Sequence, residues 1–377
     1  MEPIPKTMRA LGARKYCKPD EYEIMEVPVP KIKAPDDVLI QIHAVGITVG
    51  DALVAAGTAR MVFPSTFPII LGRQGSGVVV AVGSGVKSLR IGDAVYGVGL
   101  KHPLRKVYGN GSGGWCAEYA LTTEDLLLPK PPQVSFEDAA AVLPNLVTAI
   151  QNLRASLNMN PKAFPGGSLE GKTVLVEAGL GASTAIGAQY IKNVLGAKEV
   201  IATVSTAKVP LVHEYMPGVV DRVLDYQTQD IVAEIGRGRV DVLYSAQRHV
   251  MSLLPVMNPE HGIMSAIGLP SSSELKKILA GDGERLAWWM RLLVGMVGLL
   301  DLWYRWKLRG TNVQLKFVSG ALGMREDVEK AGEIIATGKV RAVKTLVSFD
   351  DLEAIRKGCD QARTLKGKTG SLVVKIA

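Results

Sequence analysis

The feature that most constrains the fold is a glycine-bearing stretch at residues 173–187, TVLVEAGLGASTAIG. Its first four residues predict a short buried strand, two glycines follow in a tight turn, and a helix-length segment comes next. Another apolar run follows at residues 199–204. This order is typical of a dinucleotide site, because glycines let backbone N–H groups and a helix N-terminus approach the pyrophosphate, although any α/β turn of this kind remains the alternative. The predicted contacts are Gly179, Gly181, Ser183 and Thr184.

Further apolar runs continue the pattern after this stretch and are separated by helix-length segments. The predicted strands lie at residues 200–204, 222–224, 240–245 and 262–267. Regular alternation of strands and helices predicts a doubly wound parallel sheet of the Rossmann type. We assign residues 147–314 to this nucleotide-binding domain.

The rest of the chain has many short strands and frequent turns. They are predicted at residues 8–13, 22–27, 38–46, 75–83, 94–98 and 115–121, with a short helix at 48–57 and a glycine-rich loop at 109–114. Such a pattern predicts a small β-barrel or sandwich. Helices are expected at 135–141, 148–157, 329–337 and 350–359, and strands at 315–319, 346–349 and 372–376. We therefore assign residues 1–146 together with 315–377 to a second domain.

Composition narrows the function classes. A chain of 377 residues with 47% hydrophobic content suits two globular domains, and its net charge of +8 includes no Lys/Arg tract with interleaved aromatic residues, so no nucleic-acid partner is expected. Three distant cysteines form no disulfide framework, and the five histidines never pair at metal-ligand spacing. Because residues 1–18 are basic but lack a signal-peptide core, we expect a cytoplasmic protein, with mitochondrial import as the alternative.

Residues 271–310 interrupt the alternation and contain four of the five tryptophans. On a helix, one stripe would carry Arg291, Gly295, Gly298, Arg305 and Arg309, and the opposite one Trp289, Met296, Leu300, Trp303 and Leu308. The apolar run between Arg291 and Asp301 is too short to span a bilayer. We expect a helix that packs over the sheet or in a homodimer interface. A lid over the substrate is the second alternative, and membrane contact is not expected.

Several motifs in this order resemble one superfamily. They are the run LGRQGSGVVVAVGSGV followed by IGDAVYG, the glycine stretch described above, then SFDDLEAI and a terminal SLVVKIA. The chain resembles the medium-chain dehydrogenase/reductase superfamily, and within it the zinc-independent quinone and enoyl reductases, including trans-acting enoyl reductases of polyketide pathways. The resemblance implies an α/β fold that combines a GroES-like β domain with a Rossmann domain.

The resemblance also shows where the chain departs from zinc alcohol dehydrogenases. The positions that match their catalytic zinc ligands are Thr48, Arg73, Gln74 and about Pro144, and the cysteines of their structural zinc lobe are absent. A hydroxyl, a guanidinium, a neutral amide and a proline form a poor zinc donor set. We therefore expect no metal.

The expected cofactor is NADPH. Residues 203–208, TVSTAK, contain no acid to bind a ribose 2′-OH, whereas their hydroxyls and lysine suit a 2′-phosphate. The resemblance implies that role for Ser205 and Lys208 and places Tyr226 at the adenosine end. It also implies that Thr148 and Gly268 flank the nicotinamide.

The expected reaction is hydride transfer from NADPH to an activated double bond of a small molecule: an enone, an enoyl group or a quinone. Negative charge on the substrate oxygen needs a donor, and Thr48 is the candidate, with Gln74 lining the cleft between the domains. Two alternatives stay open: a zinc-free alcohol or ketone dehydrogenase, and a non-catalytic NADPH-binding protein. A membrane-associated adaptor built on the tryptophan-rich segment is a third.

Overall fold

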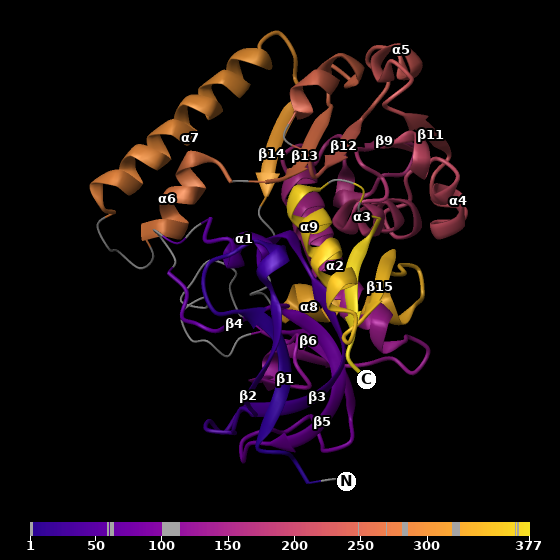
Figure 1. The fold of residues 1–377 in the computed structure, drawn as a ribbon. Helices are drawn as coiled ribbons and strands as arrows, with labels where there is room; N and C mark the ends of the chain where they lie inside the picture. Colours follow the sequence, from indigo (N-terminus) through magenta and orange to yellow (C-terminus); the bar gives the residue numbers. More distant parts are fainter. Residues whose placement is uncertain are drawn as a thin grey trace. The chain divides into compact units, whose positions relative to one another are not determined.

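The computed structural model describes residues 3–58, 60, 64–99, 114–247, 249–268, 270–280, 286–318, 325–365, 367 and 369–377. Most of the loop predicted at 109–114, and His102, lie outside these residues. The chain divides into two compact units, Met1–Val147 with Ala321–Ala377, and Thr148–Gly320. Each unit is described by itself, and Figure 1 labels most of their helices and strands.

The first unit is built mainly from antiparallel strands. A three-stranded sheet has the order β2-β1-β4, and a seven-stranded sheet has the order β15-β16-β3-β5-β6-β8 with β7 paired to β3. Its strands are β1 (Thr7–Ala13), β2 (Glu23–Pro28), β3 (Asp37–Ile47), β4 (Ile69–Ile70), β5 (Gln74–Val82), β6 (Ala94–Val98), β7 (Tyr119–Thr123), β8 (Leu127–Pro129), β15 (Lys344–Ser348) and β16 (Ser371–Lys375). Its helices include α1 (Val49–Ala55), α8 (Arg325–Ala336) and α9 (Leu352–Thr364).

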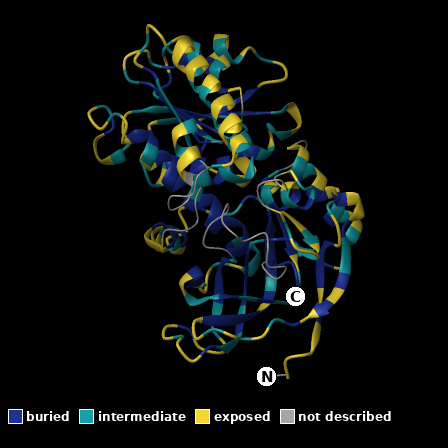
Figure 2. Ribbon diagram, turned by 90° about the vertical axis from the view of Figure 1, so that its left-hand side faces the viewer, coloured by how far each residue is buried: buried dark blue, intermediate teal, exposed yellow. Residues whose placement is uncertain are grey.

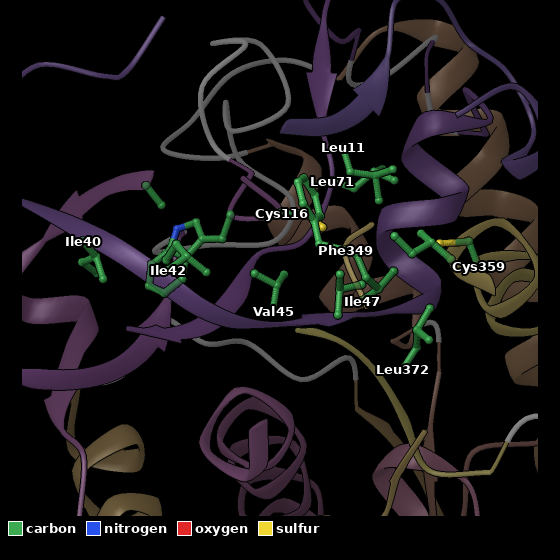
Figure 3. Close-up of a cluster of buried hydrophobic side chains, with 14 of the residues drawn as sticks. Leu11, Ile40, Ile42, Val45, Ile47, Leu71, Cys116, Phe349, Cys359 and Leu372 are labelled. Atoms are coloured by element: carbon green, nitrogen blue, oxygen red, sulfur yellow. The ribbon is translucent and has the colours of Figure 1, made fainter. Parts of the chain in front are cut away.

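One hydrophobic core joins the two sequence segments of this unit. Leu11 and Ile47 from the N-terminal segment share a buried cluster with Cys359 and Leu372 from the C-terminal segment (Figure 3). Strand β3 is central, since it pairs with β5, β7 and β16. Burial of apolar residues that lie more than 300 positions apart in sequence therefore explains why the chain returns to its first unit after the second.

Helix α2 (Phe136–Leu157) connects the units as one continuous element. The prediction of two helices, at 135–141 and 148–157, is therefore wrong. Pro144 lies inside α2, where proline removes one backbone hydrogen bond. Nearly every residue from Ala139 to Leu153 is buried, so packing on several sides outweighs that loss.

The second unit contains a six-stranded sheet in the order β11-β10-β9-β12-β13-β14, and every neighbouring pair is parallel. Its strands are β9 (Thr173–Val176), β10 (Glu199–Val204), β11 (Arg222–Asp225), β12 (Val242–Ser245), β13 (Ile263–Ile267) and β14 (Gln314–Val318). The helices between them include α3 (Ala182–Asn193), α4 (Leu211–Tyr215) and α5 (Ile231–Ile235). This is the strand order of a Rossmann sheet, and it confirms the predicted α/β class.

The domain boundary predicted at residue 315 needs a correction. Strand β14 pairs with β13 from Gln314 to Val318, so the chain stays in the second unit until Gly320. The run at 315–319 carries no pattern that distinguishes a sixth parallel strand from a strand of the first unit. Only the pairing partner decides between them.

The tryptophan-rich segment forms two helices instead of one, α6 (Ser272–Ala280) and α7 (Trp288–Lys307). They pack against each other, and Tyr304 of α7 lies 5.2 Å from Phe317 of β14, measured between ring centroids. In the described part of the chain, no helix has the length and apolar character needed to cross a membrane.

Candidate functional site

The predicted dinucleotide turn lies between β9 and α3. Gly181 is the N-cap of α3 and, as a glycine, has no side chain with which to cap the first turn of that helix. A Cβ atom on Gly179 would lie 2.7 Å from Cβ of Ala202 on β10, and one on Gly181 would lie 2.7 Å from Oγ1 of Thr184. Both positions therefore favour glycine. The N-terminus of a helix that begins at such a turn is a suitable site for an anion.

A third glycine on α3 was missed by sequence reasoning. A Cβ on Gly187 would lie 2.1 Å from the Tyr244 ring of β12, so glycine is required where the helix crosses the sheet. The dinucleotide-binding pattern predicts its third small residue at the position of Thr184 or Ala185. The close approach of helix and sheet occurs one turn later, and Gly187 was available as a signal within the same stretch.

The two hydroxyl residues of this turn have different surroundings. Thr184 is buried, and its hydroxyl donates to the carbonyl oxygen of Ala178. Ala178 itself has a left-handed backbone with φ of 53°, so this bond braces a strained residue of the turn. Ser183, by contrast, is half-buried at the start of α3.

Three residues predicted at the adenosine end lie at the carboxyl ends of neighbouring strands. Ser205 follows β10 and begins a short 3₁₀ helix that ends at Lys208, and Tyr226 follows β11 and is exposed. The backbone N–H of Tyr226 donates to the carbonyl oxygen of Val204, which holds the two strand ends together. Burial lowers the pKa of Lys208.

An acid also lies near this end of the sheet, and sequence reasoning missed it because it looked only along β10. Asp225, the last residue of β11, accepts from the hydroxyl of Thr228 at 2.9 Å and from the backbone N–H of Gln227 at 2.9 Å. A hydrogen bond from the Thr206 side chain is the main cause that lowers its pKa. The Asp225 carboxylate is thus satisfied by local donors.

The two residues predicted to flank the nicotinamide are less closely linked. Gly268 follows β13, and its N–H donates to the carbonyl oxygen of Val318 at 3.3 Å. It lies at the same carboxyl edge as the glycine turn, because all strands of the sheet are parallel. Thr148 lies on α2 and is half-buried.

A half-buried acid belongs to the same edge. Glu177 follows β9 directly, and its carboxylate accepts from the Ser245 hydroxyl at 2.6 Å, while Ser245 accepts from the N–H of Gln247 at 2.9 Å. Burial raises the pKa of Glu177, and the Ser245 hydrogen bond opposes this in part. Glu177 was overlooked because it stands inside the glycine motif, where only glycines and hydroxyls were weighed.

In the first unit, Thr48 begins α1 and forms a reciprocal cap with Asp51. The Thr48 hydroxyl donates to Oδ2 of Asp51 at 2.7 Å, and the Thr48 N–H donates to the same oxygen at 2.8 Å. The Asp51 N–H in turn points to the Thr48 hydroxyl at 3.4 Å. The hydroxyl proton that was expected to serve the substrate is therefore engaged by a buried carboxylate.

Arg73 and Gln74 lie at the start of β5 with different environments. The Arg73 guanidinium is 3.5 Å from Oδ1 of Asp51, and its side chain keeps 19% exposure while that of Asp51 keeps 2%. Gln74 is buried, and its amide donates to the carbonyl oxygen of Ala140 in α2 at 3.1 Å. Gly46 makes room for that amide, since a Cβ there would lie 2.3 Å from Nε2. Thr48, Asp51 and Arg73 thus form one charged cluster, which we call the α1 cluster.

The donor chemistry at the positions that match a catalytic zinc site fits a metal poorly. Thr48 donates to Asp51, Arg73 is a cation, Gln74 is committed to α2, and Pro144 lies within α2. Within the described ranges, no group of three or more His, Cys, Asp or Glu side chains could hold a metal ion. All three cysteines are buried and free.

Comparison with known proteins identifies the family. A model described as the alcohol dehydrogenase GroES-like domain matches residues 34–132. A 2-methylene-furan-3-one reductase of Solanum lycopersicum is 30% identical over 284 residues, which are 75% of this chain and 68% of that protein. The chain belongs to the medium-chain dehydrogenase/reductase superfamily.

Other members of this superfamily agree with the assignment. The NADPH-dependent alkenal/one oxidoreductase of Arabidopsis thaliana is 30% identical over 285 residues, 75% of this chain and 68% of its own. The solved quinone oxidoreductase from Coxiella burnetii superposes with a TM-score of 0.72 over 99% of this chain and 100% of its own, at 19% identity, and so supports the fold. The resemblance found in the sequence motifs is confirmed.

Proposed function

We propose that this protein is a zinc-independent, NADPH-dependent reductase that transfers hydride to an activated double bond of a small molecule. The observation that carries the proposal is the N-terminus of α3, which begins at a glycine N-cap and follows a turn whose two glycines would each place a Cβ only 2.7 Å from a neighbouring atom. The two plant relatives support it, because their names combine a carbonyl group with a carbon–carbon double bond. Enones, enoyl thioesters and quinones are the substrate classes of this chemistry.

The residues present fit a dinucleotide. Main-chain N–H groups in the first turn of α3 would hold the pyrophosphate, with Thr184 bracing the turn from behind. The N–H of Gly181 itself donates to the carbonyl oxygen of Ala178 at 2.7 Å and shapes the turn. Ser205, Lys208 and Tyr226 would hold the 2′-phosphate end, and Thr148 and Gly268 the nicotinamide. Bound NADPH would supply the hydride, and the protein would orient it.

We assign to the α1 cluster the role of stabilising the negative charge that develops on the substrate oxygen. Thr48 and Gln74 were the predicted donors, but both already donate to protein oxygens. Arg73 carries the positive charge of the cluster and keeps part of its surface exposed. We therefore assign stabilisation of the oxyanion to Arg73, with Asp51 and Thr48 as positioning residues.

Zinc independence is part of the proposal. It is supported by the donor set at the matching positions, in which one group is cationic and two are committed to other partners. Elemental analysis of the pure protein should find no stoichiometric zinc, and chelators should leave its turnover unchanged. One tightly bound zinc ion per chain would contradict this point.

A cytoplasmic location is also proposed. The three cysteines are free and buried, which suits a reducing compartment. Cell fractionation with compartment markers would test it directly.

The test of the proposed function is a panel of enones, enoyl thioesters and quinones with NADPH, followed at the nicotinamide absorbance. Turnover is expected with at least one class, and Arg73→Met should lower kcat while the Kd of NADPH stays unchanged. Tight NADPH binding without any turnover would favour the non-catalytic alternative. Oxidation of secondary alcohols in preference to reduction of enones would favour a dehydrogenase.

Lys208 offers a separate test of the cofactor. A charged hydrogen bond to phosphate contributes about 1.5–3 kcal/mol, so NADPH should bind at least roughly tenfold more tightly than NADH. Lys208→Ala should weaken NADPH binding and leave NADH nearly unchanged, because only the 2′-phosphate loses a partner. Equal losses for both cofactors in a calorimetric titration would show that this segment does not recognise the phosphate.

A further inference from the structure

Helix α7 exposes a continuous apolar face along its whole length. Six large side chains on this face keep between 43% and 74% of their surface exposed. They are Trp288, Leu292, Met296, Leu299, Trp303 and Trp306, and we call them the α7 apolar face. Figure 2 shows the side of the molecule on which α7 lies, with much of this helix in the colour of exposed residues. Patches of this kind on a soluble surface mark interaction sites.

The opposite side of α7 is anchored in its own unit. Val297 is the buried residue of the helix, and Tyr304 packs near Phe317 of β14. The carboxylate of Asp301 accepts from the backbone N–H of Ser272 at 2.9 Å, which caps the start of α6. These contacts fix which side of α7 faces outward, so the exposed face is a built feature of the fold.

The charges of this segment are mostly positive. Between residues 286 and 310 the sequence carries Arg291, Arg305, Lys307 and Arg309 against a single acid, Asp301, which is engaged by α6. On a helix, Arg291 and Arg305 lie on one border of the apolar face. Lys307 lies on the other border, with its ammonium group 5.7 Å from the Trp303 ring centroid and 5.2 Å from that of Trp306.

A second copy of the chain suits this face poorly. An antiparallel pairing of two α7 helices about a two-fold axis would bring Arg291 of one copy toward Arg305 of the other. No acid of α7 is free to separate these like charges, so the pairing would be opposed. A surface that is both apolar and anionic has no such conflict.

We propose that the α7 apolar face docks onto an anionic lipid bilayer, with the helix lying in the plane of the interface. The exposed leucines and Met296 would enter the acyl boundary, the tryptophans at both ends would lie at the headgroup level, and the arginines and Lys307 would meet the lipid phosphates. The sequence left a membrane-associated adaptor built on this segment as an alternative, and the length of the apolar run opposed only a helix that spans the bilayer. A helix that lies on the surface has no such requirement.

The test is co-sedimentation of the full chain with phosphatidylcholine vesicles, with and without phosphatidylserine. Binding is expected to vesicles with phosphatidylserine and to weaken as salt is raised. Replacing Leu292 and Leu299 together by Glu should abolish it. Arg291→Gln with Arg305→Gln should reduce the affinity by about fivefold for each arginine.

Matched controls keep the test specific. Lys330→Gln with Lys357→Gln removes the same charge from exposed positions of α8 and α9, and Leu346→Glu places an acid at an exposed leucine of β15. Both controls should bind vesicles like the wild type. If the wild-type protein did not bind vesicles that contain phosphatidylserine, the proposal would be overturned. A dimer in light scattering that the Leu292 and Leu299 substitutions convert to monomers would also overturn it, because a second copy would then be the occupant.

Discussion

The two candidate regions of this protein are built by different means. The carboxyl edge of the parallel sheet is formed by main-chain atoms and by glycines that leave no room for a side chain. The α1 cluster is formed by side chains, with the Asp51 carboxylate receiving two donors from Thr48 and facing the Arg73 guanidinium. The first region ends in a helix N-terminus, which suits an anionic ligand, whereas the second has most of its hydrogen-bonding capacity already used.

This difference indicates a division of labour. A cofactor that every turnover uses can be held by a rigid main-chain cradle, because its phosphates offer the same acceptors each time. A substrate oxygen that gains charge only during the reaction is better met by a cation that its neighbours hold in place. The variants below are designed to break one region while leaving the other intact.

The largest effect is expected from Asp51→Asn. The substitution leaves the Arg73 guanidinium beside a neutral amide, and breaking a buried ion pair costs about 3–5 kcal/mol. Because Arg73 keeps 19% exposure, we expect the lower part of that range, about 3 kcal/mol. Native-state hydrogen exchange can be measured separately for each unit. It should show a loss of protection in α1 and β5, and unchanged protection in the parallel sheet.

The matched control for this variant is Asp36→Asn, which removes the same charge from an exposed position of the first unit. Its effect should stay within about 0.5 kcal/mol. If both variants changed protection equally, the pairing of Asp51 with Arg73 would carry no special weight.

The next effect separates two helical glycines of the second unit. Gly187→Ala places a Cβ against the buried Tyr244 ring, where overpacking costs about 1–3 kcal/mol. Gly295→Ala meets no atom within 4 Å on exposed α7 and should stabilise by about 0.5–1 kcal/mol, because alanine favours the helix. Thermal unfolding of the two variants should shift in opposite directions. A shift in the same direction would show that the contact with Tyr244 does not limit this position.

Much of the second unit could be predicted because its signals are local. Buried parallel strands appear as short continuous apolar runs, and the strand at Thr173–Val176 was predicted with the bounds that the structure shows. The glycine turn was equally visible, since close backbone approach requires glycine in the sequence itself. Helix α2 was predicted as two pieces, because Pro144 is a local signal for a break that packing overrides.

The α1 cluster could not be predicted in the same way. Arg73 is 22 positions from Asp51, and Gln74 reaches the carbonyl oxygen of a residue 66 positions away, so neither contact follows from spacing along one element. The sequence indicated that Thr48 and Gln74 were polar residues of a β domain. It could not show that their protons were already donated to protein oxygens, since that depends on how β5, α1 and α2 pack.

The smallest effect tests Glu177 at the nucleotide edge and depends on pH. Burial raises the pKa of Glu177 in the folded protein, so the folded state holds its proton more tightly than the unfolded chain does. Stability should therefore fall as pH rises from the ordinary glutamate pKa to the raised one, with about 1.4 kcal/mol for each unit of difference. Glu177→Gln should remove this slope and make the protein more stable than the wild type at neutral pH.

The substitution Glu177→Gln, which should raise stability at neutral pH, should also raise the affinity for the cofactor at that pH. Ionised Glu177 lies beside the turn that is proposed to hold the pyrophosphate, so its charge opposes NADPH above the raised pKa. Glu177→Gln should bind NADPH more tightly at neutral pH and equally well in acid, whereas Glu170→Gln, at an exposed position of the same unit, should keep the wild-type profile. Titrations of NADPH across this pH range measure both variants. Parallel profiles for wild type and Glu177→Gln would mean that Glu177 stays neutral or lies too far from the phosphates to affect them.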